Sequence, residues 1–175
     1  LDLPIDTGQI VSIDSFIQEY NNASRGISTP LDNLFLHREK ELQELKDIIL
    51  KEDLVVLYGA PGVGKTKLAL ETIKYFVKEN PCYTAYCISY KNASLIEDLQ
   101  RYMDFDKDYV LFVDDANRID SIGQIIGFYK TSRRGKLKVV ITVRDYAYST
   151  IEKVCANLLH TSYTINVLTD EQIKD

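Results

Sequence analysis

From Leu54 onward, short apolar runs alternate with longer segments whose apolar residues recur at helical spacing. A short apolar run predicts a buried strand, and apolar residues three and four positions apart predict a helix with one buried face. The predicted strands are 54–58, 83–88, 109–113, 138–143 and 163–167. The predicted helices between them are 65–78, 95–103, 119–129 and 147–159. This alternation indicates an α/β fold, in which a five-stranded parallel sheet carries helices on both faces.

The part of the chain before Leu54 lacks this alternation. Residues 1–30 are polar with a weak helical patch, so we expect an N-terminal appendage or linker there. An amphipathic helix follows, and its apolar face consists of Leu42, Leu45, Ile48 and Ile49. We expect residues 31–170 to form one domain.

Both ends of the chain suggest a longer polypeptide. The chain begins at Leu1 rather than at a methionine, and it ends a few residues into a polar stretch. We expect residues 171–175 to begin a truncated helix. We therefore expect other domains of the same longer chain to be partners of this one.

Charge and composition narrow the classes of partner. The net charge is −5, which does not favour direct binding to nucleic acid or to an anionic membrane. No apolar run approaches the ~18 residues of a membrane span, and the first 30 residues lack the pattern of a signal peptide. The three cysteines, Cys82, Cys87 and Cys155, lack the spacing of metal ligands and suit reduced thiols in a cytoplasmic protein.

A glycine-rich segment carries the clearest chemistry. It fits the pattern Gly-x-x-x-x-Gly-Lys-Ser/Thr and lies between an apolar strand and an amphipathic helix. In such a loop the backbone N–H groups surround phosphate oxygens, and the helix N-terminus adds partial positive charge. We expect Lys65 to reach the β- and γ-phosphates and the Thr66 hydroxyl to bind Mg²⁺; the alternative is a chance glycine-rich turn. The expected phosphate-binding residues are Gly59, Ala60, Pro61, Gly62, Val63, Gly64, Lys65, Thr66 and Lys67.

Two adjacent acids follow the predicted strand 109–113. Their carboxylates should emerge at the carboxyl end of a buried strand, the edge where open α/β sheets bind ligands. We expect Asp114 to organise the metal ion and Asp115 to orient or deprotonate the attacking water. The alternative is that both acids only solvate a turn.

The predicted strand 138–143 also ends in polar residues. Thr142 and Arg144 share one face because side chains alternate along a strand. An arginine that faces the γ-phosphate can distinguish ATP from ADP, because it pairs with charge that leaves on hydrolysis. The alternative is a surface arginine that pairs with Asp145 or another acid.

Together these motifs resemble the STAND group of P-loop ATPases, the signal-transduction switches related to AAA+ proteins and to the nucleotide-binding modules of immune receptors. The resemblance rests on the loop 59–66, the pair Asp114–Asp115 and the ending Thr142-x-Arg144. A weaker match is the segment 35–42, Phe-Leu-His-Arg-Glu-Lys-Glu-Leu, which has His37 where that family usually has glycine. The resemblance implies that Leu36 and Arg38 line an adenine pocket.

The resemblance also implies a particular fold and ligand. The fold is a three-layer P-loop NTPase of the additional-strand type, with strand order 5-1-4-3-2 when the predicted strands are numbered along the chain. The ligands are ATP or ADP with Mg²⁺, and the activity is slow hydrolysis of ATP to ADP and phosphate. Family members work as molecular switches in signalling or defence, so self-association in the ATP state is expected.

The lack of an arginine at one position of the sequence bears on the expected rate of ATP hydrolysis. Ring-forming AAA+ motors commonly carry an arginine finger before the final core strand, but the sequence has no arginine between Asp145 and Asp175. Loss of such a group costs on the order of 10³ to 10⁵ in rate, which favours a timer over a motor. Two alternatives stay open: a non-hydrolysing scaffold that nucleotide stabilises, and an origin-recognition-like AAA+ ATPase.

Overall fold

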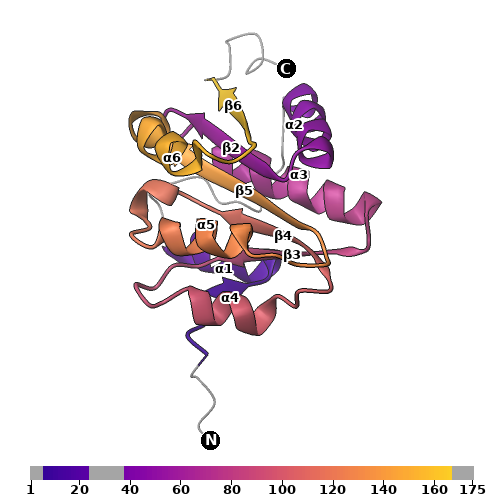
Figure 1. Ribbon diagram of the computed structural model, residues 1–175. Helices are drawn as coiled ribbons and strands as arrows, with labels where there is room; N and C mark the ends of the chain where they lie inside the picture. Colours follow the sequence, from indigo (N-terminus) through magenta and orange to yellow (C-terminus); the bar gives the residue numbers. More distant parts are fainter. Residues whose placement is uncertain (1–5, 24–37, 167–175) are drawn as a thin grey trace, which may run out of the picture.

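The computed structural model describes residues 6–23 and 38–166, and it has an α/β fold with one sheet between two layers of helices (Figure 1). The strands are β1 (Ile10–Val11), β2 (Leu54–Gly59), β3 (Tyr83–Ile88), β4 (Asp108–Val113), β5 (Leu137–Arg144) and β6 (Thr161–Ile165). The α-helices are α1 (Ile13–Ala23), α2 (Glu39–Lys51), α3 (Lys65–Glu79), α4 (Ile96–Tyr102), α5 (Ile122–Lys130) and α6 (Tyr148–Cys155). Two short 3-10 helices are η1 (Ala116–Arg118) and η2 (Asp145–Ala147).

The sheet has six strands in the order β1-β3-β4-β5-β2-β6, which corrects the expected five-stranded order. Strands β2 to β6 pair in parallel with one another, as the alternation of strands and helices predicts. The additional strand, β1, pairs antiparallel with β3 at the edge of the sheet. The sheet is therefore mixed rather than purely parallel.

A buried glutamine explains why a two-residue strand forms at this edge. The Gln9 side chain is fully buried, and its Nε2 donates to Asp98 Oδ2 at 2.8 Å. Its Oε1 accepts from the backbone N–H of Lys91 at 3.0 Å, and its backbone oxygen accepts from Ser89 N at 2.7 Å. Because buried polar groups need partners, these bonds fix the segment in register. Two residues are too few for a periodic pattern, so the sequence carries no strand signal here.

The strands divide the core into two halves. On one face, buried side chains of α1, α2 and α3 pack against residues such as Val55, Phe112 and Val140. On the other face, helices α4, α5 and α6 cover residues such as Val56 and Ile141. Apolar residues thus line both faces of each central strand, as expected of a parallel sheet that is buried on both sides. Within residues 6–23 and 38–166, no helix is long and apolar enough to cross a membrane.

Part of the segment that we expected to be an appendage contributes to this core. Strand β1 and helix α1 both come from residues 10–23, and Phe16 of α1 is 7% exposed. Its ring packs edge-on against Phe112 of β4, with ring centroids 5.7 Å apart. The predicted boundary at residues 30 and 31 and the helix predicted from residue 171 lie outside the described residues and stay predictions.

We predict that Phe16→Ala lowers the free energy of unfolding by about 3 kcal/mol, because it removes a buried ring from the core. Chemical denaturation monitored by circular dichroism measures this loss. Gln18→Ala, on the exposed side of the same helix, should change the free energy by less than about 0.5 kcal/mol. Equal stability of both variants and the wild type would mean that α1 adds nothing to the fold.

Candidate functional site

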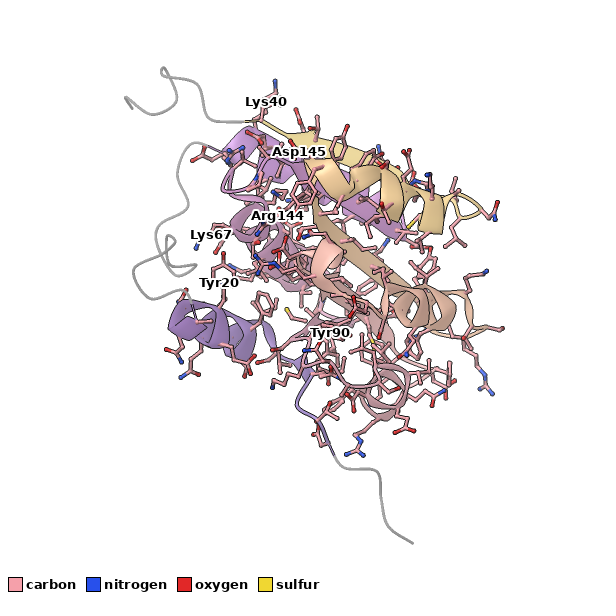
Figure 2. All side chains as sticks on the ribbon, turned by 90° about the vertical axis from the view of Figure 1, so that its left-hand side faces the viewer. Tyr20, Lys40, Lys67, Tyr90, Arg144 and Asp145 are labelled. Carbon is pink, nitrogen blue, oxygen red and sulfur yellow. The ribbon has the colours of Figure 1, made fainter. Side chains whose placement is uncertain are left out.

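The carboxyl ends of three neighbouring strands bring the predicted site residues together. In the register of β2 with β5, Gly59 lies opposite Arg144. Strand β4 flanks β5 on the other side, and Val113 lies opposite Ile141. The acids that follow β4 and the polar end of β5 therefore meet beside the glycine-rich loop. Figure 2 shows Lys67 and Arg144 at this same end of the sheet.

The loop from Gly59 to Gly64 depends on glycine at three positions. A side chain at Gly59 would place its Cβ 2.5 Å from the Ile165 backbone oxygen, so β6 leaves no room for one. Gly62 has φ 79° and Gly64 has φ 92°, a backbone region that glycine adopts without strain. Helix α3 begins at Lys65, immediately after Gly64, so its free N–H groups face the loop. A glycine loop that leads into a helix N-terminus presents backbone N–H donors, an arrangement that suits an anion.

The Lys65 ammonium lies within the loop. Its side chain is 8% exposed, and Nζ donates to the backbone oxygens of Gly59 at 3.1 Å and Ala60 at 2.8 Å. Burial lowers the pKa of Lys65, and the charges of Asp115 and Asp114 act against that shift. The same environment includes Arg144, so the predicted lysine, acids and arginine share one electrostatic neighbourhood.

Asp114 is held between two threonine hydroxyls. Both Thr66 Oγ1 and Thr142 Oγ1 donate to Asp114 Oδ1, each at 2.7 Å. Burial raises the pKa of Asp114, and these two hydrogen bonds act to lower it. The cluster joins α3, β4 and β5 through a single carboxylate oxygen.

Asp115 contacts two arginines. Arg144 Nε lies 3.3 Å from Asp115 Oδ1, and Arg118 Nε lies 3.2 Å from Asp115 Oδ2. The Asp115 charge raises the pKa of Arg144. Asp115 has φ 52°, and its N–H donates to Thr142 Oγ1 at 2.8 Å, which fixes its unusual backbone conformation. The acid that pairs with Arg144 is therefore Asp115 rather than Asp145. Sequence reasoning missed Arg118, although its spacing from Asp115 on a short helical turn is a usable signal.

The remaining predicted site residues lie around the loop. Arg38 precedes α2, and its guanidinium contacts the backbone oxygens of Val63 and Asn166. Lys67, on the first turn of α3, pairs with Glu71 at 3.3 Å. Leu36 lies outside the described residues, so the adenine pocket stays a prediction.

The residues present suit one hard divalent cation. Residues 6–23 and 38–166 contain no group of three or more His, Cys, Asp or Glu side chains that could hold a metal alone. The Thr66 hydroxyl and the Asp114 carboxylate place two oxygen atoms next to each other beside the loop. Mg²⁺ typically takes one or two protein oxygens and completes its shell with water and phosphate oxygens. The donor set therefore fits Mg²⁺ bound together with a phosphate ligand.

Solved structures share this fold at low sequence identity. The chain matches the E. coli MS115-1 HORMA:CdnC:Trip13 complex with a TM-score of 0.55 and 15% identity, covering 79% of this chain and 65% of that chain. Rhizobiales Trip13 matches with a TM-score of 0.53 and 16% identity, covering 81% and 66%. The S. cerevisiae Hsp104–ADP complex matches with a TM-score of 0.56 and 14% identity, covering 96% and 32%. The chain thus spans less than two thirds of each of these proteins.

No curated protein matches the chain. The model of one protein family, described as Novel STAND NTPase 3, matches residues 36–175, which include the loop, the acidic pair and Arg144. The chain is a member of the Novel STAND NTPase 3 family.

Proposed function

We propose that this NTPase domain binds ATP and ADP with Mg²⁺, hydrolyses ATP slowly, and serves as a molecular switch in a larger signalling or defence protein. The observation that carries the proposal is the meeting of the glycine loop, the Thr66–Asp114–Thr142 cluster and the Arg144–Asp115 pair at one sheet edge. The proposal that the nucleotide carries adenine is supported by the family resemblance and by one structural neighbour, Hsp104, which was solved with ADP.

Each part of the site has a distinct task in this proposal. The loop N–H groups and the Lys65 ammonium bind the β- and γ-phosphates. Thr66 and Asp114 would hold Mg²⁺, which neutralises phosphate charge when it is bound. Asp115 orients the attacking water and accepts its proton, since an acid beside the loop can reach that position.

Arg144 supplies the response to hydrolysis. Arg144 is the last residue of β5 and lies opposite Gly59, and its side chain is 28% exposed while it pairs with Asp115. A γ-phosphate would compete with Asp115 for this guanidinium, and loss of that phosphate would restore the pair. Such an exchange gives the domain two arrangements that ATP and ADP favour differently. Self-association in the ATP arrangement and regulation by other domains of a longer chain are part of this proposal.

Binding is the first test. Purified protein should bind ATP and ADP at micromolar levels, and Lys65→Ala should weaken binding at least about 100-fold, because it removes a buried charge-assisted contact to phosphate. Titration with a fluorescent nucleotide analogue measures both. Lys138→Met is the matched control, because Lys138 is also buried but lies near Asp53, at the amino ends of the strands. Equal affinity of wild type and Lys65→Ala would contradict the site.

The Asp114 carboxylate gives a pH-dependent prediction. Burial raises its pKa in the folded protein. The folded state therefore loses stability as the pH rises above about 3.9, the pKa of an aspartate in the unfolded chain. An asparagine at this position would keep an oxygen that accepts from Thr66 and Thr142 without carrying charge. Asp114→Asn should therefore exceed the wild type in stability by about 0.5–2 kcal/mol at pH 7, a gain of the size seen when a functional site loses its strain.

Thermal unfolding between pH 3.5 and 8 measures this effect, and the gain should shrink toward pH 4, where both side chains become neutral. The same substitution should remove the dependence of nucleotide binding on Mg²⁺. A difference in stability that stays constant with pH would show that burial does not penalise the charge of Asp114.

Hydrolysis is the third test. The wild type should turn over no faster than about once a minute, far below the roughly 10 s⁻¹ that is typical of enzymes. Asp115→Asn should retain ATP binding and reduce hydrolysis at least about 100-fold, because general base catalysis contributes about that much. Assays with radiolabelled ATP measure the hydrolysis rates of the wild type and of Asp115→Asn. Asp120 is an exposed acid close by in the sequence, and Asp120→Asn should hydrolyse ATP as the wild type does.

A second candidate function is that of a scaffold that binds nucleotide without hydrolysing it. The Asp115 carboxylate is already engaged by Arg144 and Arg118, which favours a domain that binds nucleotide without hydrolysing it. If the wild type and Asp115→Asn retain ATP unchanged over hours, the nucleotide-stabilised scaffold is correct. Multiple rapid turnovers by the wild type would instead contradict the slow switch.

A further inference from the structure

Arg38 has an unusual position for a residue expected to contact a base. It immediately precedes α2, and its side chain is only 5% exposed. Nη1 donates to Glu41 Oε2 at 2.6 Å, which fixes the plane of the guanidinium. Nη2 donates to the Val63 backbone oxygen at 2.7 Å and to the Asn166 backbone oxygen at 3.1 Å. One nitrogen thus joins the glycine loop to the residue that follows β6.

The Val63 oxygen needs such a donor. A loop that surrounds an anion points its N–H groups inward, so its carbonyl groups must point away from the ligand. Val63 is 9% exposed, which leaves its backbone oxygen little access to water. Gly64, the next residue, has φ 92°, and a Cβ there would lie 3.8 Å from Arg38 Nε. Arg38 therefore packs behind the loop. It donates the hydrogen bond that the Val63 carbonyl would otherwise lack in this loop conformation.

The end of β6 is in contact with the same loop at a second point. The Cα of Gly59 faces the Ile165 backbone oxygen so closely that a Cβ would lie 2.5 Å from it. Asn166, the next residue, accepts the second hydrogen bond from Arg38. The loop is therefore in direct contact with β6 at Gly59, and at Val63 it is linked through Arg38 to Asn166, the residue after β6. A change in the conformation of the loop would therefore alter its contacts with residues 165 and 166.

We propose that Arg38 is a positioning residue, which holds the loop in its phosphate-binding conformation and couples that conformation to the end of β6. This inference rests on the proposed function, and it assigns Arg38 to the phosphates rather than to the base. Both protons of Nη2 are donated to backbone oxygens and one proton of Nη1 is donated to Glu41, so three of the five guanidinium N–H groups are engaged within the protein. The guanidinium supports the ligand through the loop and not by direct contact.

Binding of inorganic tripolyphosphate separates these two roles, because this ligand has phosphates and no base. Competition against a fluorescent ADP analogue in the presence of Mg²⁺ should give affinities for ATP and tripolyphosphate. Arg38→Met should weaken both by about tenfold, since one loop carbonyl loses its partner. Arg38→Lys should recover only part of the loss, because an ammonium can donate to backbone oxygens but lacks the second nitrogen that pairs with Glu41 and fixes the plane of the group.

Arg133→Met is the matched control. Arg133 also bridges backbone oxygens, those of Asp104 at 2.8 Å and Lys107 at 2.7 Å, but at the amino ends of the strands. Its loss should lower stability without changing either affinity. If Arg38→Met weakens ATP but not tripolyphosphate, Arg38 reads the base and the proposal is wrong. Equal affinity losses in Arg133→Met would attribute the effect to general destabilisation and would also overturn it.

Hydrogen exchange tests the coupling to β6. Mg-ATP should slow exchange of the amides of residues 161–166 in the wild type, and this protection should be lost in Arg38→Met at saturating ATP. Wild-type protein that binds ATP without protecting these amides would overturn the coupling and leave nucleotide binding intact. Wild-type protein that binds no nucleotide would instead refute the proposed function, so the two failures are distinct.

Discussion

The parallel pairing of β2 with β5 is the constraint on which the rest of the site depends. It places the last residue of one strand, Gly59, opposite the last residue of the other, Arg144. Thr142, two positions earlier in β5, then shares a face with Arg144 and reaches both the carboxylate of Asp114 and the backbone of Asp115. A shift of one residue in this register would turn Thr142 to the opposite face. The loop and the acids would then no longer meet.

This arrangement concentrates charge where little water is present. Burial lowers the pKa of Lys65 and raises that of Asp114, so each ionised group is unfavourable alone and is stabilised by the other. A core of this size carries such a cost only because the strands are buried on both faces and held by apolar packing. Opposed pKa shifts of neighbouring groups are typical of sites that bind or transform a charged ligand. The two burial costs therefore weaken the fold, while an unpaired Lys65 ammonium suits an anion and an unpaired Asp114 carboxylate suits a cation.

Local patterns predicted most of the fold. The apolar runs indicated strands β2 to β6, and the spacing of glycines indicated the loop, because each depends on residues adjacent in the chain. Strand β1 was missed because its position depends on Gln9 and partners more than 80 residues away. Phe16 was classed with an appendage because a short amphipathic patch does not reveal that Phe112 covers it. The contacts of Arg38 with Val63 and Asn166 were also beyond reach, since backbone oxygens carry no signature in the sequence.

Asp115 pairs with two arginines, Arg144 and Arg118. This double pairing affects the cost of moving Arg144 from the carboxylate to a phosphate. If a phosphate drew Arg144 away, Asp115 would keep its contact with Arg118, which lies 3.2 Å from its other oxygen. Removing the sole partner of a buried charge is strongly unfavourable, by about 3–5 kcal/mol. Arg118 is 67% exposed and Asp115 26% exposed, so the remaining pair would stay in contact with water and avoid most of that cost. In the proposed exchange, Asp115 would therefore lose little when Arg144 turns to a phosphate. A small cost on the carboxylate side would let the presence of one phosphate group decide between the two proposed arrangements.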